Sequence, residues 1–338
     1  DEASQVHGDE LQGDRTPQIH TFVDLPAAQV AEAWGDGIYD QTEVYRRTLC
    51  QFDGYLLDIF QVRGGDVHDW FFHGIGEKPF FSIPMEEKTG FEPALYVTRG
   101  GEEYKEGKAD ETFAATWRIV ADPESPEAGR RKDVYSRVTV AGSLNQVAYL
   151  LDTYPNPGRH SLMVRHRDSD TPFVSVHEAY NENPIVTDLK LLPGQQATTI
   201  RISHRDVSER LVILGSGSGF DDLSMVGHLG ALEFDPVGQL RSLMLIGGTE
   251  IRYGDLCIQT DRKTCLSVLV DQESLKLASS PSISYETIEG ERVYRTDQDT
   301  TVQLDVPSDL SPTRQRMQKR VVVPGKIEDG VAPVEVAL

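Results

Sequence analysis

Several features that define common function classes are scarce or missing in this sequence of 338 residues. No apolar run approaches the roughly 18 residues that a membrane-spanning helix needs, so we do not expect a membrane protein. The motifs G-x-x-x-x-G-K-[ST], G-x-S-x-G and H-E-x-x-H are absent. Their absence disfavours nucleotide binding and removes the commonest hydrolase signals.

Cysteine is also scarce, with three residues in the chain. Cys257 and Cys265 are close enough in sequence to bridge the arms of a hairpin, and Cys50 is left over. Three free thiols fit the sequence equally well. Cysteine usage therefore does not fix the redox compartment.

Positive charge is in short supply: 33 lysines and arginines face 54 acidic residues, which gives a formal net charge of -21. This charge repels nucleic acid and anionic lipid, so we expect neither as a partner. An acidic polysaccharide would need a local cationic groove, in this chain or in another domain. The compact basic clusters are Arg46-Arg47, which suits a carboxylate or sulfate, and residues 130–132, which are typical of a solvated loop.

Alternation of apolar and polar residues dominates the rest of the chain and predicts half-buried β-strands. Turn clusters separate most of these segments, which favours antiparallel sheets packed as a sandwich. The sequence thus predicts an all-β protein, with a large two-layer antiparallel β-sandwich at residues 1–214 and a smaller C-terminal β-domain at 215–338. The glycine- and serine-rich segment 215–220 is the expected hinge. The expected strands are residues 55–62, 112–120, 134–141, 160–167, 173–180, 197–203, 210–214, 240–246, 264–270 and 300–306, whereas 27–34 suits either a short helix or a strand.

The densest group of chemically active side chains lies between Asp58 and His73. Gly64 and Gly65 predict a turn between two strands, which would place Asp58 on a strand next to the histidines. On the second strand, alternation puts His68 and Trp70 on one face and His73 on the other. The two histidines therefore diverge, which weakens a zinc site built from Asp58, His68 and His73 because metal ligands must converge.

The same region resembles the sheet-domain signature of heparinase II/III-like polysaccharide lyases. The matching residues, in order and spacing, are Arg46-Arg47-Thr48-Leu49, Tyr55-Leu56-Leu57-Asp58, Gly64-Gly65, His68-Asp69-Trp70 and Phe72-His73-Gly74, with a weaker match at residues 173–178. Asp1-Glu2-Ala3-Ser4-Gln5 resembles the segment that follows a metal-binding histidine in these proteins. The resemblance implies a β-sandwich that belongs to a longer protein.

These lyases cleave uronic-acid-containing polysaccharides by β-elimination, which requires a base, a proton donor and a group that neutralises the carboxylate. The resemblance implies that an N-terminal helical toroid supplies most of this chemistry, and that zinc or another divalent metal is bound upstream of residue 1 rather than in this chain. Here His68 and His73 are the weak catalytic candidates, and Arg46, Arg47 and Trp70 are the candidates for contact with an acidic polysaccharide. We expect a secreted or periplasmic protein that is inactive without the toroid; the sequence leaves homodimerisation open.

Two other function classes remain open. In a non-catalytic carbohydrate-binding sandwich, Trp34, Trp70 or Trp117 would stack on sugars. In a small metal-dependent β-barrel enzyme, Asp58, His68 and His73 would hold the metal.

Overall fold

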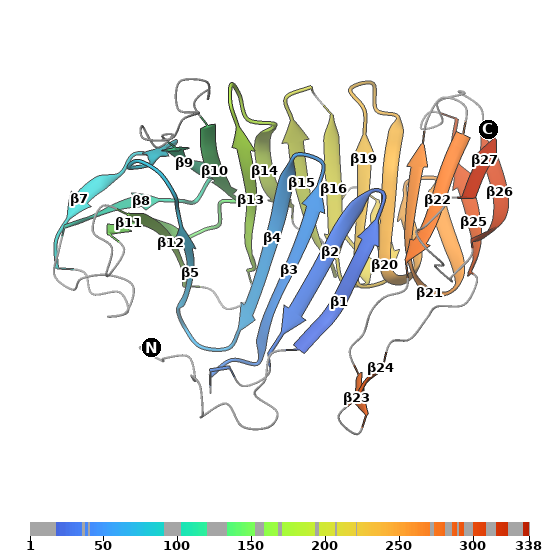
Figure 1. Cartoon of the computed structure of the whole chain (residues 1–338), viewed down its shortest axis with the longest axis horizontal. Helices are drawn as coiled ribbons and strands as arrows, with labels where there is room; N and C mark the ends of the chain where they lie inside the picture. Colours follow the sequence, from blue (N-terminus) through green and yellow to red (C-terminus); the bar gives the residue numbers. More distant parts are fainter. Residues whose placement is uncertain are drawn as a thin grey trace, which may run out of the picture. The chain divides into compact units, whose positions relative to one another are not determined.

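The structure is a computed structural model, and strands dominate it (Figure 1). The described part of the chain has no helix, and so none long and apolar enough to cross a membrane. This confirms the predicted all-β class with several antiparallel sheets. The described residues are 18–35, 38–39, 41–90, 103–119, 134–152, 159–167, 171–192, 196–206, 208–220, 222–270, 274–280, 286–288, 291–293, 300–308, 316–323 and 334–337.

The chain divides into two compact units. Unit 1 is Asp1–Gln18, Trp34–Leu49 and Gly54–Leu189, and unit 2 is Ile19–Ala33, Cys50–Asp53 and Lys190–Leu338. This division differs from the expected boundary at residue 215. The expected hinge lies inside unit 2, where β17 (Gly217–Ser218) pairs with β18 (Leu223–Val226), so the middle of this segment forms part of a sheet.

Two sheets carry the strands of unit 1. An eight-stranded sheet, whose first two strands belong mostly to unit 2, has the order β1 (Gln18–Leu25), β2 (Ala28–Trp34), β3 (Val44–Phe52), β4 (Tyr55–Arg63), β13 (Phe173–Tyr180), β10 (Val134–Val140), β9 (Phe113–Ile119) and β6 (Phe80–Phe81). A five-stranded sheet has the order β5 (His68–His73), β12 (His160–His166), β11 (Val147–Asp152), β8 (Tyr104–Lys108) and β7 (Glu86–Lys88).

The two sheets of unit 1 pack face to face because each contributes apolar residues to one buried cluster, which makes this unit a sandwich. Strand alternation explains the packing: Trp70 and Phe72 of β5 join this cluster, whereas Phe71 joins a second cluster on the other side of the five-stranded sheet. The shared cluster comprises Phe60, Val62, Trp70, Ala109, Phe113, Ala115, Trp117, Val138, Val140, Ala148, Leu162, Val164 and Phe173.

Unit 2 is built on a twelve-stranded sheet, and β1 and β2 lie largely within the same unit. The main strand order is β14 (Val186–Leu192), β15 (Thr198–His204), β16 (Glu209–Leu214), β19 (Leu229–Phe234), β20 (Leu240–Tyr253), β21 (Leu256–Val270), β22 (Ser274–Ser280) and β27 (Val334–Ala337). Beside this path, β18 pairs with β20, β25 (Thr300–Val306) pairs with β21, and β26 (Met317–Val323) pairs with β25; β23 (Glu286–Ile288) and β24 (Glu291–Val293) form a separate hairpin.

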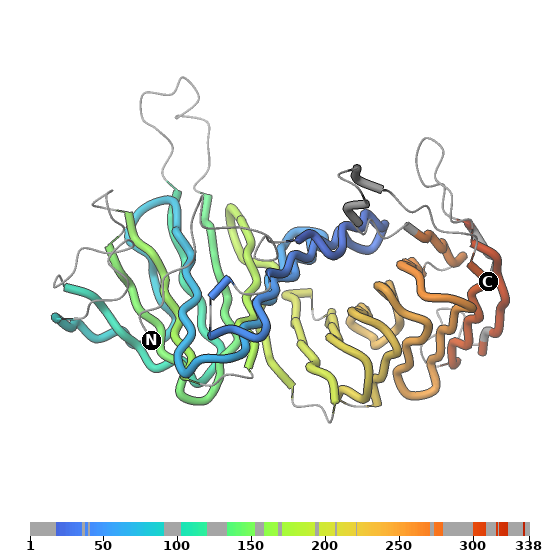
Figure 2. The backbone as a smooth tube through the Cα atoms, turned by 90° about the horizontal axis from the view of Figure 1, so that it is seen from below, coloured from blue at the N-terminus to red at the C-terminus, as the bar shows by residue number. Residues whose placement is uncertain are grey.

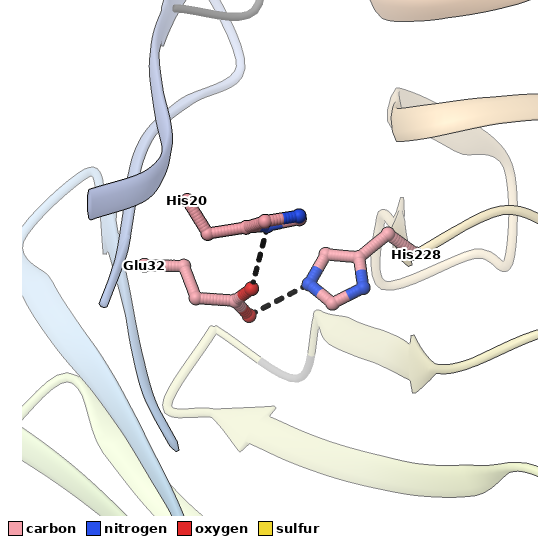
Figure 3. A group of neighbouring side chains, drawn as sticks. All are labelled: His20, Glu32 and His228. Atoms are coloured by element: carbon pink, nitrogen blue, oxygen red, sulfur yellow. Dashed lines mark hydrogen bonds and ion pairs between the residues drawn. The ribbon is translucent and has the colours of Figure 1, made fainter. Parts of the chain in front are cut away.

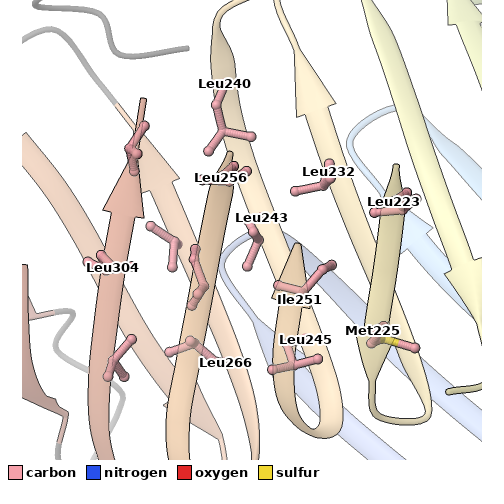
Figure 4. Packing of buried hydrophobic residues seen from close by; sticks show 14 of the residues in the cluster. Leu223, Met225, Leu232, Leu240, Leu243, Leu245, Ile251, Leu256, Leu266 and Leu304 are labelled. Carbon is pink, nitrogen blue, oxygen red and sulfur yellow. The ribbon is translucent and has the colours of Figure 1, made fainter. Parts of the chain in front are cut away.

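The two longest strands give unit 2 its second layer. β20 pairs first with β19 and then with β18, and its pairing with β21 shifts register on both sides of Gly248. Such irregularities bend strands, and Gly247 has a positive φ of 59° at this point. Leucine and isoleucine side chains from both halves of the bent strands therefore meet in one core (Figure 4). Figure 2 shows the curved course of these strands in yellow and orange.

All ten expected strands are present, most with shifted ends, and β20 and β21 run well beyond the segments expected for them. Residues 28–34 form a strand, so the helical alternative for this segment was wrong. Cys257 and Cys265 lie on the same strand, β21, and neither they nor Cys50 form a disulfide. The expected turn at Gly64 and Gly65 is confirmed by positive φ angles of 91° and 78°.

Candidate functional site

Three side chains from distant parts of the sequence meet in unit 2: His20, Glu32 and His228 (Figure 3). The Nδ1 atom of His20 lies 3.0 Å from Oε1 of Glu32, and Nε2 of His228 lies 2.6 Å from Oε2. One potential ligand atom from each residue lies within 4.8 Å of the other two. The two imidazole rings meet edge to face, with centroids 5.5 Å apart.

Strand alternation places the carboxylate. On β2, Ala28, Val30 and Glu32 are buried on one face, so a charged residue occupies a position where alternation calls for an apolar one. Its side chain is 1% exposed. A buried carboxylate needs hydrogen bonds or a countercharge, and the two imidazoles provide contacts to both of its oxygens.

Backbone hydrogen bonds fix the position of His228, which lies between β18 and β19. Its N–H donates to the carbonyl oxygen of Ile246 at 3.0 Å, and its own carbonyl accepts from the N–H of Gly215 at 2.9 Å. Gly247 follows Ile246 with a positive φ, which favours glycine beside this histidine. The bend in β20 therefore positions the imidazole of His228.

A pocket of about 460 Å³ lies beside the two histidines in unit 2. His20 and His228 line it and their side chains are 38% and 23% exposed, whereas Glu32 lies outside the lining. The pocket also contains one cationic side chain, that of Lys263. The other lining residues are Thr21, Ser216, Val226, Gly227, Ile246, Gly247 and Cys265.

Asp58 is paired elsewhere, within unit 1. The Arg47 guanidinium donates two hydrogen bonds to its carboxylate, at 3.0 and 2.6 Å, and Nε2 of His177 lies 3.5 Å away. Burial raises the pKa of Asp58, but hydrogen bonds from His177 and Arg47 outweigh burial, and the net pKa is lowered. Asp58 is therefore ionised near neutral pH.

His68 and His73 are not brought together with Asp58. The expected adjacency was wrong, because β4 and β5 belong to different sheets: β4 pairs with β13 and β5 pairs with β12. Among the described residues, these three do not form a group of converging metal ligands. His73 hydrogen-bonds through Nδ1 to the Ser161 hydroxyl at 2.8 Å, while burial lowers the pKa of His68, which favours its neutral form.

The aromatic and basic candidates have structural contacts. Trp70 and Trp117 are 4% and 0% exposed within the core of unit 1, so neither indole presents a face to a sugar. The guanidinium of Arg46 lies 4.9 Å from the centre of the Trp34 ring, a cation–π contact. Arg47 is committed to Asp58. The basic cluster 130–132 and the segment 1–5 lie outside the described residues.

A second polar surface, which we call the amide groove, lies on β20, β21, β25 and β26 of unit 2. Two neighbouring pockets of about 330 and 490 Å³ share Gln259, Gln303 and Arg320, which face one another across strands. Charges of both signs line the groove, including Glu250, which accepts hydrogen bonds from Arg252 and Gln259. The groove therefore offers hydrogen bonds rather than net positive charge.

Sequence reasoning missed His20, Glu32 and His228 because 196 residues separate Glu32 from His228. One local signal was present: the pattern Ala28, Val30, Glu32 puts a carboxylate on an apolar face. Comparison with known proteins adds no assignment, since no family model matches the chain and no curated protein matches it.

Proposed function

We propose that this chain is the β-sheet portion of a polysaccharide lyase that cleaves uronic-acid-containing polysaccharides by β-elimination. In this proposal it serves as scaffold and cleft wall for an N-terminal helical toroid and is inactive alone. The protein is secreted or periplasmic, and the family's zinc or other divalent ion is bound upstream of residue 1.

The supporting observation is that the side chains that resemble the lyase signature have structural contacts within unit 1. Asp58 is neutralised by Arg47, and Asp69 by Arg165, through hydrogen bonds of 2.6 to 3.0 Å. Trp70 fills the core. Side chains that are committed in this way stabilise a sandwich, and they leave the base, the proton donor and the carboxylate-binding group to another part of the protein.

The test measures elimination directly, as new ultraviolet absorbance from the unsaturated uronate product. We expect no turnover of heparin, heparan sulfate or alginate by residues 1–338, and turnover of one of them when the natural upstream segment precedes residue 1. In that longer protein, His73→Gln should leave kcat and KM unchanged, because Nδ1 of His73 is hydrogen-bonded to the Ser161 hydroxyl at 2.8 Å. Sustained elimination by residues 1–338 alone would refute the proposal.

A non-catalytic carbohydrate-binding module is the second candidate, and the amide groove favours it. Planar amides and guanidinium groups provide the directional hydrogen bonds that sugar hydroxyls require. Gln303 lies centrally, opposite Gln259 on one side and Arg320 on the other. Calorimetric titration with soluble oligosaccharides should then show binding that Gln303→Ala weakens. Gln29→Ala is the control, because Gln29 is exposed and bonds to Asp24 on the β1–β2 hairpin.

A further inference from the structure

We infer that His20, Glu32 and His228 form a binding site for one divalent transition-metal ion of the zinc type. This site lies within the chain itself and is distinct from the metal that the lyase proposal places upstream of residue 1. It stands or falls independently of the lyase proposal, because it rests on three side chains of unit 2 alone.

The ligand set carries the inference. Two imidazoles and one carboxylate are ligands of intermediate hardness that suit zinc, cobalt and nickel better than calcium or magnesium, which prefer oxygen. Nε2 of His228 hydrogen-bonds to Oε2 of Glu32 at 2.6 Å, and Nδ1 of His20, which also contacts the Thr21 hydroxyl, lies 3.0 Å from Oε1 of the same carboxylate. Convergence of this kind is what the set Asp58, His68 and His73 lacks.

The spacing is close to what an ion requires. Bonds of about 2.0–2.1 Å in a tetrahedron separate ligand atoms by about 3.3 Å, and the three ligand atoms here lie within 4.8 Å of one another. In the proposed site, rotation of the two partly exposed imidazoles closes the remaining difference. Glu32 is buried behind them, and the backbone of His228 is held by hydrogen bonds to Ile246 and Gly215.

Three protein ligands leave a fourth tetrahedral position for a non-protein ligand. The histidines line the pocket of about 460 Å³ while Glu32 lies outside the lining, so this position is directed toward the pocket. Lys263 lines the same pocket. A water molecule or an anionic oxygen fits there, since the ion and the Lys263 ammonium both attract negative charge.

Zinc titration of residues 1–338 stripped of metal tests the site. We expect one zinc per chain by calorimetry and by elemental analysis after dialysis. Changing groups that merely orient a ligand costs about 10–100-fold in affinity, so removing a ligand should cost at least about 100-fold. That loss is expected for His228→Asn and for His20→Asn. Glu32→Gln should weaken binding while it preserves side-chain shape.

His160→Asn is the matched control. His160 also contacts a carboxylate, that of Asp152 at 2.9 Å, but it does not belong to the group of possible metal ligands among the described residues. Its zinc affinity should equal that of the wild type. Circular dichroism identifies variants that fail to fold. Zinc X-ray absorption of the wild type does not depend on any variant, and it should reveal two imidazole ligands. Failure of the wild type to bind zinc, or undiminished zinc binding by the double variant His20→Asn/His228→Asn, would overturn the proposal.

Discussion

Two buried carboxylates, one in each unit, are held in contrasting ways. Asp58 in unit 1 is paired with a guanidinium, which is charged at every relevant pH. Glu32 in unit 2 is contacted by two imidazoles that line a pocket, and imidazoles bind metals when they are neutral. A buried carboxylate can thus be a structural residue or part of a binding site, and the chemistry of its partners distinguishes the two roles.

The largest expected effect is on stability and tests the structural role of Asp58. Arg47→Met leaves the buried Asp58 carboxylate without its guanidinium, but the Arg47 side chain is 48% exposed and solvent screens the pair. We therefore expect a loss of about 1–3 kcal/mol, between the values for an exposed and a fully buried pair. Denaturant unfolding should report that decrease in the free energy of unfolding. Arg63→Met is the control, because Arg63 and Glu43 are exposed and 3.6 Å apart, a type of pair worth about 0–1 kcal/mol. Equal losses in the two variants would contradict an architectural role for Asp58.

The next effect is stabilisation by zinc, and it tests the site formed by His20, Glu32 and His228. A ligand that binds only the folded state at 100 times its Kd stabilises that state by about 2.7 kcal/mol. Zinc should therefore raise the unfolding midpoint of the wild type and of Arg47→Met by similar amounts, since Arg47 belongs to the other carboxylate. It should not raise that of His228→Asn. A zinc-dependent shift in His228→Asn would place the ion elsewhere.

The smallest effect concerns pH. Because the pKa of Asp58 is lowered in the folded state, its contribution to stability is complete above its unfolded pKa of about 4. That contribution is lost as pH falls through the lower folded pKa. Unfolding midpoints measured from pH 6 to pH 3 should fall less steeply in Asp58→Asn than in the wild type. Parallel curves for the two proteins would contradict the pairing with Arg47 and His177.

Much of the fold could be predicted from local sequence. Alternation gave the strand type of β4, β5 and β13, and it assigned Trp70 and His73 to opposite faces of β5, because side-chain direction depends on adjacent residues. Sheet membership could not be read in this way. Gly64 and Gly65 predicted a turn, but the choice between pairing β5 with β4 or with the distant β12 depends on the packing of a whole sandwich.

The candidate site was harder to predict for the same reason. Glu32 is anomalous within its own strand, but its partner His228 is brought near by the bend of β20 around Gly247 and Gly248 and by the turn between β18 and β19. Those features are tertiary. A carboxylate on an apolar strand face is therefore the signal to search for, and coordinates are needed to find the histidines that it contacts.

The most direct test of the contrast between the two carboxylates is anomalous diffraction at the zinc edge, from crystals of residues 1–338 grown with zinc. We expect a peak bounded by His20, Glu32 and His228 and none beside Asp58, His68 or His73. A peak at the latter residues, or none at His20, Glu32 and His228, would contradict it.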